Sequence, residues 1–429
     1  MRSFFKKVVT VILTLIAKAI LWRHSPKVIA ITGSVGKTST KDAVYTVLKG
    51  QGSVRKSDKS FNSELGVPLS IIGAETGWNN PITWLGVMTR GLWQVIEPKG
   101  SYPDTLVLEV GADRPGDIQR IAKWIKPHIV VITRLPDVPV HIEFFPTLSS
   151  LIEEKLSLAR SLRKDGTLIL NADDPRVMAA RDTLRFRTVT YGTREDAMIR
   201  ASNVQLLAPG DTTAGGLTFK VDFDGKSFPV MLPNIYGESF MSIALAALSV
   251  AYASGVNMVT AISDLASYET PPGRVRLLPG IGGTVLIDDT YNSSPAACEA
   301  GLCMLRELPF GKRKIAVIGD MLELGRHTTE AHHQVGELAA RSADVLVTVG
   351  LRAKLCADGA RSVGMPDKKI LETEDAKSVA ALMKEMLRPG DVIYLKGSQG
   401  IRLERAVREL MAEPERAAEL LVRQEREWK

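Results

Sequence analysis

Short apolar runs rich in Val, Ile and Leu alternate with helical patterns along most of the chain. The first run, residues 28–33, leads through a Gly-containing turn into a helical pattern over residues 40–50. Similar runs follow at residues 104–112, 128–135 and 166–174. Strands that are buried on both faces read as continuous apolar runs, and helical patterns at 118–125 and 148–163 separate these runs. The alternation therefore predicts an α/β domain with a mostly parallel sheet covered on both faces.

The pattern changes at residues 199–232, where apolar residues alternate singly and the turns are rich in Gly and Asp. Single alternation is typical of strands with one exposed face, so this segment predicts a small antiparallel sheet appended to the first domain. An apolar helical pattern at residues 239–255 then closes that domain.

A second α/β alternation follows a connection at residues 269–276, which contains a Pro pair and a Gly. Its strand patterns lie at residues 284–291, 314–321, 344–350 and 390–398, and each precedes a helical pattern. This arrangement predicts a Rossmann-like C-terminal domain. We therefore expect an N-terminal segment (1–27), a central domain (28–270) with an insertion at about 73–103, and a C-terminal domain (271–429).

The first 27 residues are basic and partly apolar. They contain six Lys and Arg and no Asp or Glu, which leaves a net charge of +1 for the rest of a chain whose total is +7. The near-neutral charge of the rest of the chain therefore argues against a general nucleic-acid-binding surface. The apolar run from Val8 to Ala17 is short for a spanning helix, which needs about 20 apolar residues. A helix in the membrane interface, a helix packed on the protein, and a secretory signal cleaved near Lys18 remain open.

The three cysteines are an odd number for a disulfide framework and show no paired metal-ligand spacing. Cys298, Cys303 and Cys356 therefore indicate packing thiols in a reducing compartment.

The strongest motif is TGSVGKTS, residues 32–39, between the first strand and the first helix. Backbone N–H groups of such a turn close around phosphate oxygens, Lys37 can neutralise the phosphates, and the Thr38 hydroxyl can reach Mg²⁺. A general P-loop carries Gly five residues before Gly36, where this chain has Ile31. The expected nucleotide-binding residues are Gly33, Ser34, Val35, Gly36, Lys37, Thr38 and Ser39.

This shortened loop resembles that of the Mur ligase family, and the similarity extends over nearly all of residues 28–410. Residues 62–68 (NSELGVP) resemble the family's Asn-x-x-x-Gly-x-Pro segment, and residues 108–112 (LEVGA) resemble its acidic strand end. The resemblance implies an ATP-dependent ligase that uses Mg²⁺, with Asn62 at the substrate and Thr38 and Glu109 at the metal. A carboxylate at the end of a strand beside a P-loop suits a hard cation.

Two further residues are implied as ligands of a second Mg²⁺. His141 follows a strand as in the family, although Thr133 and Arg134 stand where an asparagine is usual and the spacer is longer. Lys155 aligns with a lysine that is carbamylated in many Mur ligases, and a carbamate resembles a carboxylate ligand. A solvated loop histidine and a surface lysine paired with Glu153 or Glu154 are the alternatives.

The adenine side of the site departs from the family pattern. Residues 171–174 resemble its NADD turn, but Ser239, Phe240 and Ile243 stand where the family carries histidine and asparagines. The resemblance therefore implies altered adenine contacts.

In the last domain the motifs resemble the MurF branch of the family. Pro272-Gly273-Arg274 is similar to a linker whose arginine approaches the phosphates, and residues 288–295 (DDTYNSSP) are similar to the DDxYNxxP motif. The implied catalytic set is Lys37, His141, Lys155 and Arg274. Implied nucleotide contacts are Asn292 and Arg274, and implied substrate contacts in this domain are Asp288, Asp320, Glu323 and Lys396.

By this resemblance, ATP phosphorylates a substrate carboxylate and an amine attacks the resulting acyl phosphate. In the MurF branch the amine is D-alanyl-D-alanine and the carboxylate belongs to a UDP-linked muramoyl tripeptide of peptidoglycan synthesis. The P-loop begins by residue 33, so we do not expect the usual UDP-binding domain. A different, lipid-linked acceptor and a nucleotide-binding scaffold without turnover therefore remain open. We expect a cytoplasmic monomer with no nucleic-acid partner.

The insertion holds Trp78, Trp84 and Trp93, half of the six Trp of the chain, and Trp22 ends the N-terminal apolar run. Amphipathic aromatic rings favour the membrane interface. One hypothesis is that the insertion and the N-terminal segment form a surface facing the inner side of the cell membrane. The alternative is that the insertion covers the N-terminal helix and both are ordinary core.

Overall fold

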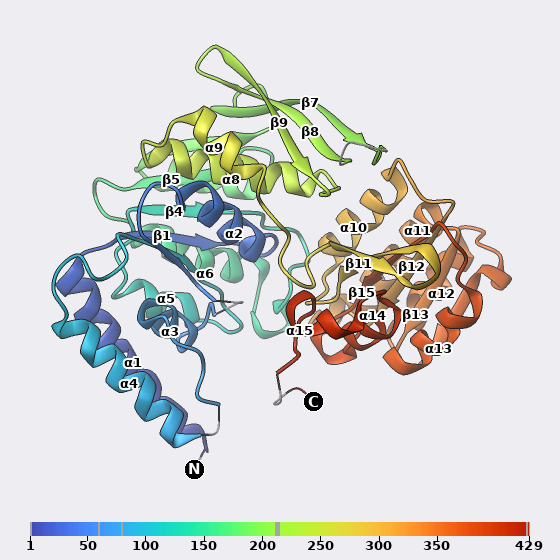
Figure 1. Ribbon diagram of the computed structural model, residues 1–429, viewed down its shortest axis with the longest axis horizontal. Coiled ribbons are helices and arrows are strands. Elements are labelled where there is room, and N and C mark those ends of the chain that lie inside the picture. Colours follow the sequence, from blue (N-terminus) through green and yellow to red (C-terminus); the bar gives the residue numbers. More distant parts are fainter. Residues whose placement is uncertain (1, 59–60, 79, 211–214, 426–427, 429) are drawn as a thin grey trace.

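Two open sheets, each covered by helices on both faces, organise the chain (Figure 1). The computed structural model describes residues 2–58, 61–78, 80–210, 215–425 and 428, with side chains from residue 5 onward. Within these ranges one sheet has nine strands and the other has six. The predicted α/β class is confirmed.

The nine described strands of the first sheet lie in the order β2-β3-β1-β4-β5-β6-β7-β8-β9. They are β1 (Lys27–Thr32), β2 (Val54–Lys56), β3 (Thr105–Glu109), β4 (Ile129–Ile132), β5 (Thr167–Asn171), β6 (Arg187–Gly192), β7 (Ile199–Leu207), β8 (Gly216–Phe223) and β9 (Lys226–Pro233). The pairings from β2 to β7 are parallel. The carboxyl ends of β1, β3 and β4 therefore meet at one edge, where the P-loop and the acidic strand end lie.

The antiparallel strands β7, β8 and β9 continue the main sheet instead of standing apart from it. β7 pairs in parallel with β6 through Tyr191 with Ile199 and Gly192 with Arg200. Two residue pairs are too short a junction to be recognised from alternation along the sequence. Residues 211–214 of the predicted Gly- and Asp-rich turn lie outside the described residues.

Alternate residues of the central strands enter two different cores. Val28 and Ala30 of β1 pack into the core under one set of helices, and Ile29 and Ile31 pack into the other. This is why the strand reads as a continuous apolar run. One face carries α2 (Lys37–Leu48), α8 (Ser239–Ala253) and α9 (Met258–Leu265). The other face carries α1 (Arg2–His24), α3 (Gly66–Ile72), α4 (Pro81–Ile96), α5 (Asp117–Ala122), α6 (Leu148–Arg160) and α7 (Pro175–Thr183).

The second sheet has the order β10-β11-β15-β12-β13-β14 in the described part of the chain. Its strands are β10 (Arg276–Gly280), β11 (Thr284–Asp289), β12 (Arg313–Gly319), β13 (Val345–Val349), β14 (Ile370–Thr373) and β15 (Asp391–Lys396). Helices α10 (Pro295–Glu307), α11 (Thr328–Ser342) and α12 (Lys354–Ser362) cover one face, and α13 (Ala376–Met386), α14 (Glu404–Leu410) and α15 (Ala417–Leu420) cover the other. The antiparallel edge strand β10 follows the predicted interdomain connection directly.

Helices α1 and α4 lie side by side at the edge of the first domain (Figure 1). Val9, Leu13 and Ile20 of α1 share a core with Trp84 and Val87 of α4. The N-terminal segment is therefore a helix packed on the protein through one face. Among the described residues, no helix is both long enough and apolar enough to cross a membrane.

Candidate active site

The P-loop is the turn between β1 and α2, and its shape depends on glycine and on the end of β4. Gly36 has φ 85° and precedes the first residue of α2. Gly33 has φ 141°, and a Cβ there would lie 1.9 Å from Thr133 Oγ1. The Thr133 hydroxyl in turn donates a hydrogen bond of 2.7 Å to the Val35 carbonyl. A residue with a side chain at position 33 would therefore displace the strand end that holds the loop.

Donors that face the P-loop cleft lack partners among the described residues. The buried Ser34 Oγ and the buried Arg274 Nε have no hydrogen-bond partner there. Lys37 is partly buried, and this burial lowers the pKa of its ammonium, whereas Glu109 raises it and nearby Arg274 lowers it. Two buried donors without acceptors, beside two cations, fit a polyanion, and the loop at a helix N-terminus fits its phosphates.

Glu109 ends β3 directly beside the loop and is buried. Its Oε2 accepts a hydrogen bond of 2.9 Å from the Thr38 hydroxyl, and its Oε1 accepts one of 3.0 Å from Asn62 Nδ2. The described part of the chain contains no group of three His, Cys, Asp or Glu arranged to hold a metal ion. Mg²⁺, however, is commonly bound by one or two protein oxygens together with substrate phosphates and water. Thr38 and Glu109 fit that kind of site.

Lys155 points into the cleft and not to the helix surface. It is buried, and burial together with the charge of Lys37 lowers its pKa to about 7. The neighbouring glutamates have other partners: Glu153 pairs with Arg160, and Glu154 accepts from the backbone N–H groups of residues 116, 118 and 119. The alternative of a surface lysine paired with Glu153 or Glu154 is therefore wrong.

His141 sits between two carboxylates and is partly buried. Its Nδ1 lies 2.5 Å from Glu323 Oε2, and its Nε2 lies 3.4 Å from Asp113 Oδ1. Burial lowers the pKa of His141, whereas Asp113 and Glu323 raise it. The ring is thus held across the two domains, which differs from a solvated loop histidine.

Arg274 approaches the P-loop from the start of the C-terminal domain. Its guanidinium carbon lies 4.0 Å from the centre of the Tyr291 ring, and Nη2 donates to the Thr38 hydroxyl at 3.4 Å. Stacking on Tyr291 holds the planar fork at the cleft, where a phosphate can accept two parallel hydrogen bonds.

These groups line one cleft of about 710 Å³ between the two domains. Of the residues expected from the sequence, those in its wall are Ser34, Val35, Gly36, Lys37, Thr38, Asn62, Glu109, His141, Lys155, Arg274, Asn292 and Glu323. Gly33, at the start of the loop, and Ser39, in the first turn of α2, are not part of the wall.

Asp288, Asp320 and Lys396 also lie behind the wall, which differs from the expectation of substrate contact. Asp288 accepts from Gly273 N and from the Thr290 hydroxyl, and burial raises its pKa to about 6. Lys396 Nζ lies 2.6 Å from Asp289 Oδ2.

The third of these residues, Asp320, accepts from Ala353 N at 2.7 Å. Because buried polar groups need such partners, all three residues hold strand ends and turns in place.

Sequence reasoning missed the contribution of the C-terminal tail. Arg423 donates to the Thr290 carbonyl at 3.2 Å and lies 3.3 Å from Glu404 Oε2. Trp428 lines the cleft and meets Trp78 edge to face, with ring centres 6.1 Å apart. The feature of the sequence that could have indicated this contribution is a single aromatic residue, Trp428, in a highly charged tail.

Comparison with known protein families agrees with this geometry. The Mur ligase middle domain matches residues 31–251, and the Mur ligase, glutamate ligase domain matches residues 273–399. The chain belongs to the Mur ligase family.

Within this family, the similar curated proteins include UDP-N-acetylmuramoyl-tripeptide--D-alanyl-D-alanine ligases. The one from Bacillus subtilis is 28% identical over 400 residues, which cover 93% of this chain and 79% of the relative. The one from Escherichia coli is 28% identical over 392 residues, which cover 90% of this chain and 76% of the relative.

Among solved Mur ligase structures, MurF ligase from Thermotoga maritima in complex with ADP has a TM-score of 0.75 and 27% identity, and the match covers 95% of this chain and 84% of that one. MurF from Acinetobacter baumannii has a TM-score of 0.76 and 23% identity, with 92% and 79% covered, and supports the fold.

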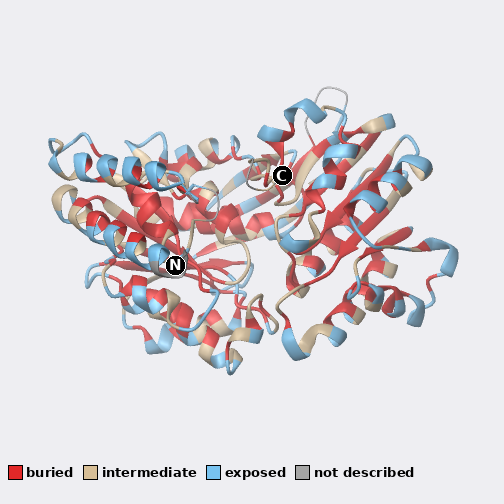
Figure 2. Cartoon of the chain, turned by 90° about the horizontal axis from the view of Figure 1, so that it is seen from below, coloured by how far each residue is buried: buried red, intermediate tan, exposed pale blue. Residues whose placement is uncertain are grey.

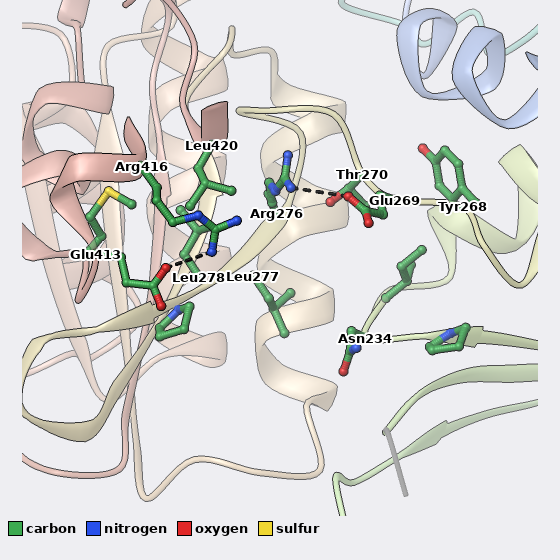
Figure 3. A pocket seen from close by; sticks show the side chains of 14 residues that line it. Asn234, Tyr268, Glu269, Thr270, Arg276, Leu277, Leu278, Glu413, Arg416 and Leu420 are labelled. Atoms are coloured by element: carbon green, nitrogen blue, oxygen red, sulfur yellow. Dashed lines mark hydrogen bonds and ion pairs between the residues drawn. The ribbon is translucent and has the colours of Figure 1, made fainter. Parts of the chain in front are cut away.

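A second, smaller hollow of about 310 Å³ lies at the interdomain connection of this Mur ligase (Figure 3). It is lined by residues from the end of β9, from the connection and from the C-terminal domain. Arg276 pairs with Glu269 and Arg416 pairs with Glu413 in its wall. Because its charged groups are already paired, it differs from the P-loop cleft, where donors are left over.

Proposed function

We propose that this chain is an ATP-dependent peptide ligase of the MurF type, which joins D-alanyl-D-alanine to the carboxyl group of a UDP-linked muramoyl tripeptide in peptidoglycan synthesis. The observation that carries the proposal is the convergence of Lys37 and Arg274, from two domains, on one cleft that contains buried donors without partners. The similarity to MurF proteins over most of both chains supports this choice of substrates. It also favours that choice over a lipid-linked acceptor or a scaffold without turnover.

Amide formation from a carboxylate requires that one oxygen become a leaving group. A carboxylate oxygen forms a bond to the γ-phosphorus of ATP while the bond to the β-phosphate oxygen breaks, and ADP leaves. The substrate amine then forms a bond to the acyl carbon, phosphate leaves with the electron pair of the broken C–O bond, and the amine loses a proton. Both steps depend on positioning and on neutralising oxygen charge.

Each of these requirements has a residue in the cleft. The loop backbone and Lys37 would hold the triphosphate, and Arg274 would neutralise charge on the phosphoryl group as it transfers. Arg274 belongs to the C-terminal domain, so it reaches the phosphates only while the two domains are closed. Closure also excludes water from the acyl phosphate. In this proposal Asn292 provides a further nucleotide contact. The adenine ring would bind near Ser239–Ala253, as expected from the sequence.

Mg²⁺ held by Thr38 and Glu109 would neutralise phosphate charge when bound. We propose that Lys155 and His141 lie at a second such ion. A neutral Lys155 amine can attack CO₂, forming an N–C bond and releasing a proton, and the resulting carbamate is anionic. A pKa of about 7 makes the neutral amine abundant at physiological pH.

The two predicted domains have different roles in this proposal. In the proposal, residues 28–270 bind the nucleotide and residues 271–429 bind the amine, with Asn62 and Glu323 on the substrate side of the cleft. Asp288, Asp320 and Lys396 position the wall. We further propose that the protein acts as a monomer in the cytoplasm, at the inner face of the cell membrane.

The test combines ATP, Mg²⁺, D-alanyl-D-alanine and a UDP-muramoyl tripeptide with the full chain. Product mass and amine-dependent phosphate release are expected, and Lys37→Ala is expected to abolish both. Lys49→Ala, an exposed lysine just after the same helix, is the matched control and should retain activity. Phosphate release that ignores the amine, or equal activity of Lys37→Ala, would overturn the proposal.

A further inference from the structure

We propose that the outward faces of α1 and α4 form one surface, here called the α1–α4 face, that binds the headgroup region of a bilayer rich in anionic phospholipid. This surface and this lipid class would account for the membrane location given in the proposed function. Only the biological purpose of the binding rests on that function, since binding to lipid does not require ligase activity. The helices would lie in the interface without crossing the bilayer, in agreement with the absence of a spanning helix among the described residues.

Helix α1 has two different apolar stripes. One stripe, with Val9, Leu13, Ile16 and Ile20, is buried in the domain core. The other is exposed and consists of Phe5, Val8, Val11, Ile12, Leu15 and Trp22. At 100° per residue the exposed stripe spans about one third of the helix circumference. Its centre lies about 110° around the helix from the centre of the buried stripe, so it occupies a different side of α1 from the one that packs on the domain.

Helix α4 repeats this arrangement. Trp84 and Val87 are buried in the same core as the stripe of α1. The exposed apolar side chains of α4 are Ile82, Leu85, Leu92, Trp93 and Ile96. Trp22 is 84% exposed and Ile82 is 79% exposed. Large side chains that are exposed to this extent contribute little to packing within the protein.

The two helices are held together as a parallel pair. A Cβ at Gly91 would lie 2.6 Å from Ile16 Cγ2, so the absence of a side chain at Gly91 permits the close approach. Near the carboxyl ends of the helices, a ring nitrogen of His24 lies 2.7 Å from the Gln94 carbonyl oxygen. The exposed stripes therefore belong to one rigid unit at the domain edge, and Figure 2 shows exposed positions along the outer helices of the molecule.

Exposed apolar residues are concentrated on this unit. Of the 17 large apolar side chains that are exposed in the described residues, 11 belong to α1 or α4. Scattered exposed apolar residues are normal on a soluble protein, but a contiguous group indicates a binding surface. Figure 1 places both helices at the lower left edge of the first domain, with the C-terminal domain at the right.

The charges around the α1–α4 face indicate which kind of partner it binds. Lys6, Lys7 and Lys18 on α1 and Arg90 on α4 are exposed, and neither helix contains an Asp or Glu. Cations beside apolar and Trp side chains are typical of helices that lie on anionic membranes. A second copy of the chain would bring the same positive charges together, which disfavours self-association through this face. An anionic lipid surface matches both the apolar and the charged part.

The experiment measures binding of the full chain to vesicles, without nucleotide or ligase substrates. Mixed phosphatidylcholine and phosphatidylglycerol vesicles are compared with phosphatidylcholine vesicles by co-sedimentation. We expect binding to the mixed vesicles that weakens with salt and with loss of phosphatidylglycerol. The variant Leu15→Gln, Trp22→Gln, Ile82→Gln, Trp93→Gln should lower the ratio of bound to free protein at least about tenfold.

The matched apolar control is Met198→Gln, Val259→Gln, Leu351→Gln, three exposed apolar residues outside the α1–α4 face. For charge, Lys7→Glu with Lys18→Glu should weaken binding at least about tenfold, whereas Lys368→Glu with Lys369→Glu should not. All four variants should keep the unfolding temperature and the amine-dependent phosphate release of the natural chain, because the changed residues are exposed and lie outside the cleft.

Absence of vesicle binding, or equal losses in the test and control variants, would overturn the inference. Binding that is independent of phosphatidylglycerol would overturn the choice of anionic lipid. If the natural chain does not bind vesicles but forms a dimer, and the apolar variant dissociates that dimer, then the α1–α4 face serves self-association and not lipid binding. Because none of these readouts uses ligase activity, a failed activity assay and a failed vesicle assay point to different errors.

Discussion

The Nδ1 atom of His141 lies 2.5 Å from Glu323 Oε2, and this contact joins the loop after β4 to the loop after β12 in the other domain. Both residues have positive φ, 69° and 63°, so each loop is bent where it reaches the cleft. Left-handed backbone at a non-glycine residue is uncommon and gathers at functional sites. The pair therefore marks the place where the two halves of the proposed site meet.

Removing the charge of Glu323 should change the titration of His141. Burial lowers the pKa of His141 and Glu323 raises it, so Glu323→Gln is expected to lower that pKa further. NMR titration of the histidine ring measures the shift. Glu337→Gln is the control, because Glu337 lies 3.1 Å from His333 Nδ1 and should leave His141 unchanged. An unchanged His141 titration in Glu323→Gln would show that the contact does not persist in solution.

Arg274 should matter more for turnover than for ATP affinity. In the proposed mechanism it neutralises charge that grows during phosphoryl transfer, and it stacks on Tyr291 as a planar fork. Arg274→Ala is expected to lower kcat about a hundredfold to a thousandfold. Arg274→Lys should recover only a small part, because an ammonium lacks the fork. The matched control is Arg341→Ala on α11, and steady-state kinetics at varied ATP separate kcat from KM. A rise in KM alone would assign Arg274 to ground-state binding.

The P-loop shape should depend on the pair Gly33 and Thr133. A Cβ at Gly33 would collide with the Thr133 hydroxyl, and φ 141° is itself unfavourable for a side chain. Gly33→Ala is expected to lower the free energy of unfolding by about 2 kcal/mol or more and to weaken ATP binding. Thr133→Ala in the same chain should recover part of both losses by removing the collision. A double-mutant cycle in urea measures this coupling, and strict additivity would contradict it.

The parts of the site that were predictable from sequence are those formed by neighbouring residues. The strand, Gly turn, Lys37 and Thr38 follow one another in the chain, so their geometry is a local property. Glu109 was placed correctly beside them because parallel strands bring their carboxyl ends to one edge. Its role, like those of the other cleft residues, stays a prediction.

Residues whose partners come from distant segments could not be placed in this way. Lys396 is paired with Asp289 on the adjacent strand β11, and that pairing depends on the strand order of the sheet. For the same reason the sequence did not show that Asp288 would hold the Gly273 turn. Carboxylates and amines at strand ends have the same local pattern whether they bind substrate or support a turn.

The buried amine of Lys155 gives a prediction about stability and pH. Its pKa in the folded protein is about 7, whereas an unfolded lysine titrates near 10.5, so the unfolded chain binds more protons between these values. The free energy of unfolding contributed by this residue must therefore rise with pH above about pH 7, and below that value the folded state carries the full cost of a buried ammonium.

Replacing Lys155 with methionine removes the titration but keeps an unbranched chain of similar length. Lys155→Met is expected to stabilise the protein by about 1–3 kcal/mol near pH 6, and by less near pH 9. Urea unfolding in CO₂-free buffer measures both differences, and Lys123→Met, an exposed lysine after α5, should show neither.

Carbamylation of the same amine is tested separately with ¹³C-labelled bicarbonate. A carbamate signal should appear in the natural chain, grow as pH rises through about 7, and be absent from Lys155→Met. A signal that persists in Lys155→Met would assign the carbamate to another amine. A stability difference that stays constant from about pH 6 to about pH 9 would mean that Lys155 titrates as an ordinary lysine. In that case the cleft would contain more water, and its cations would be more strongly screened, than the burial of Lys155 implies.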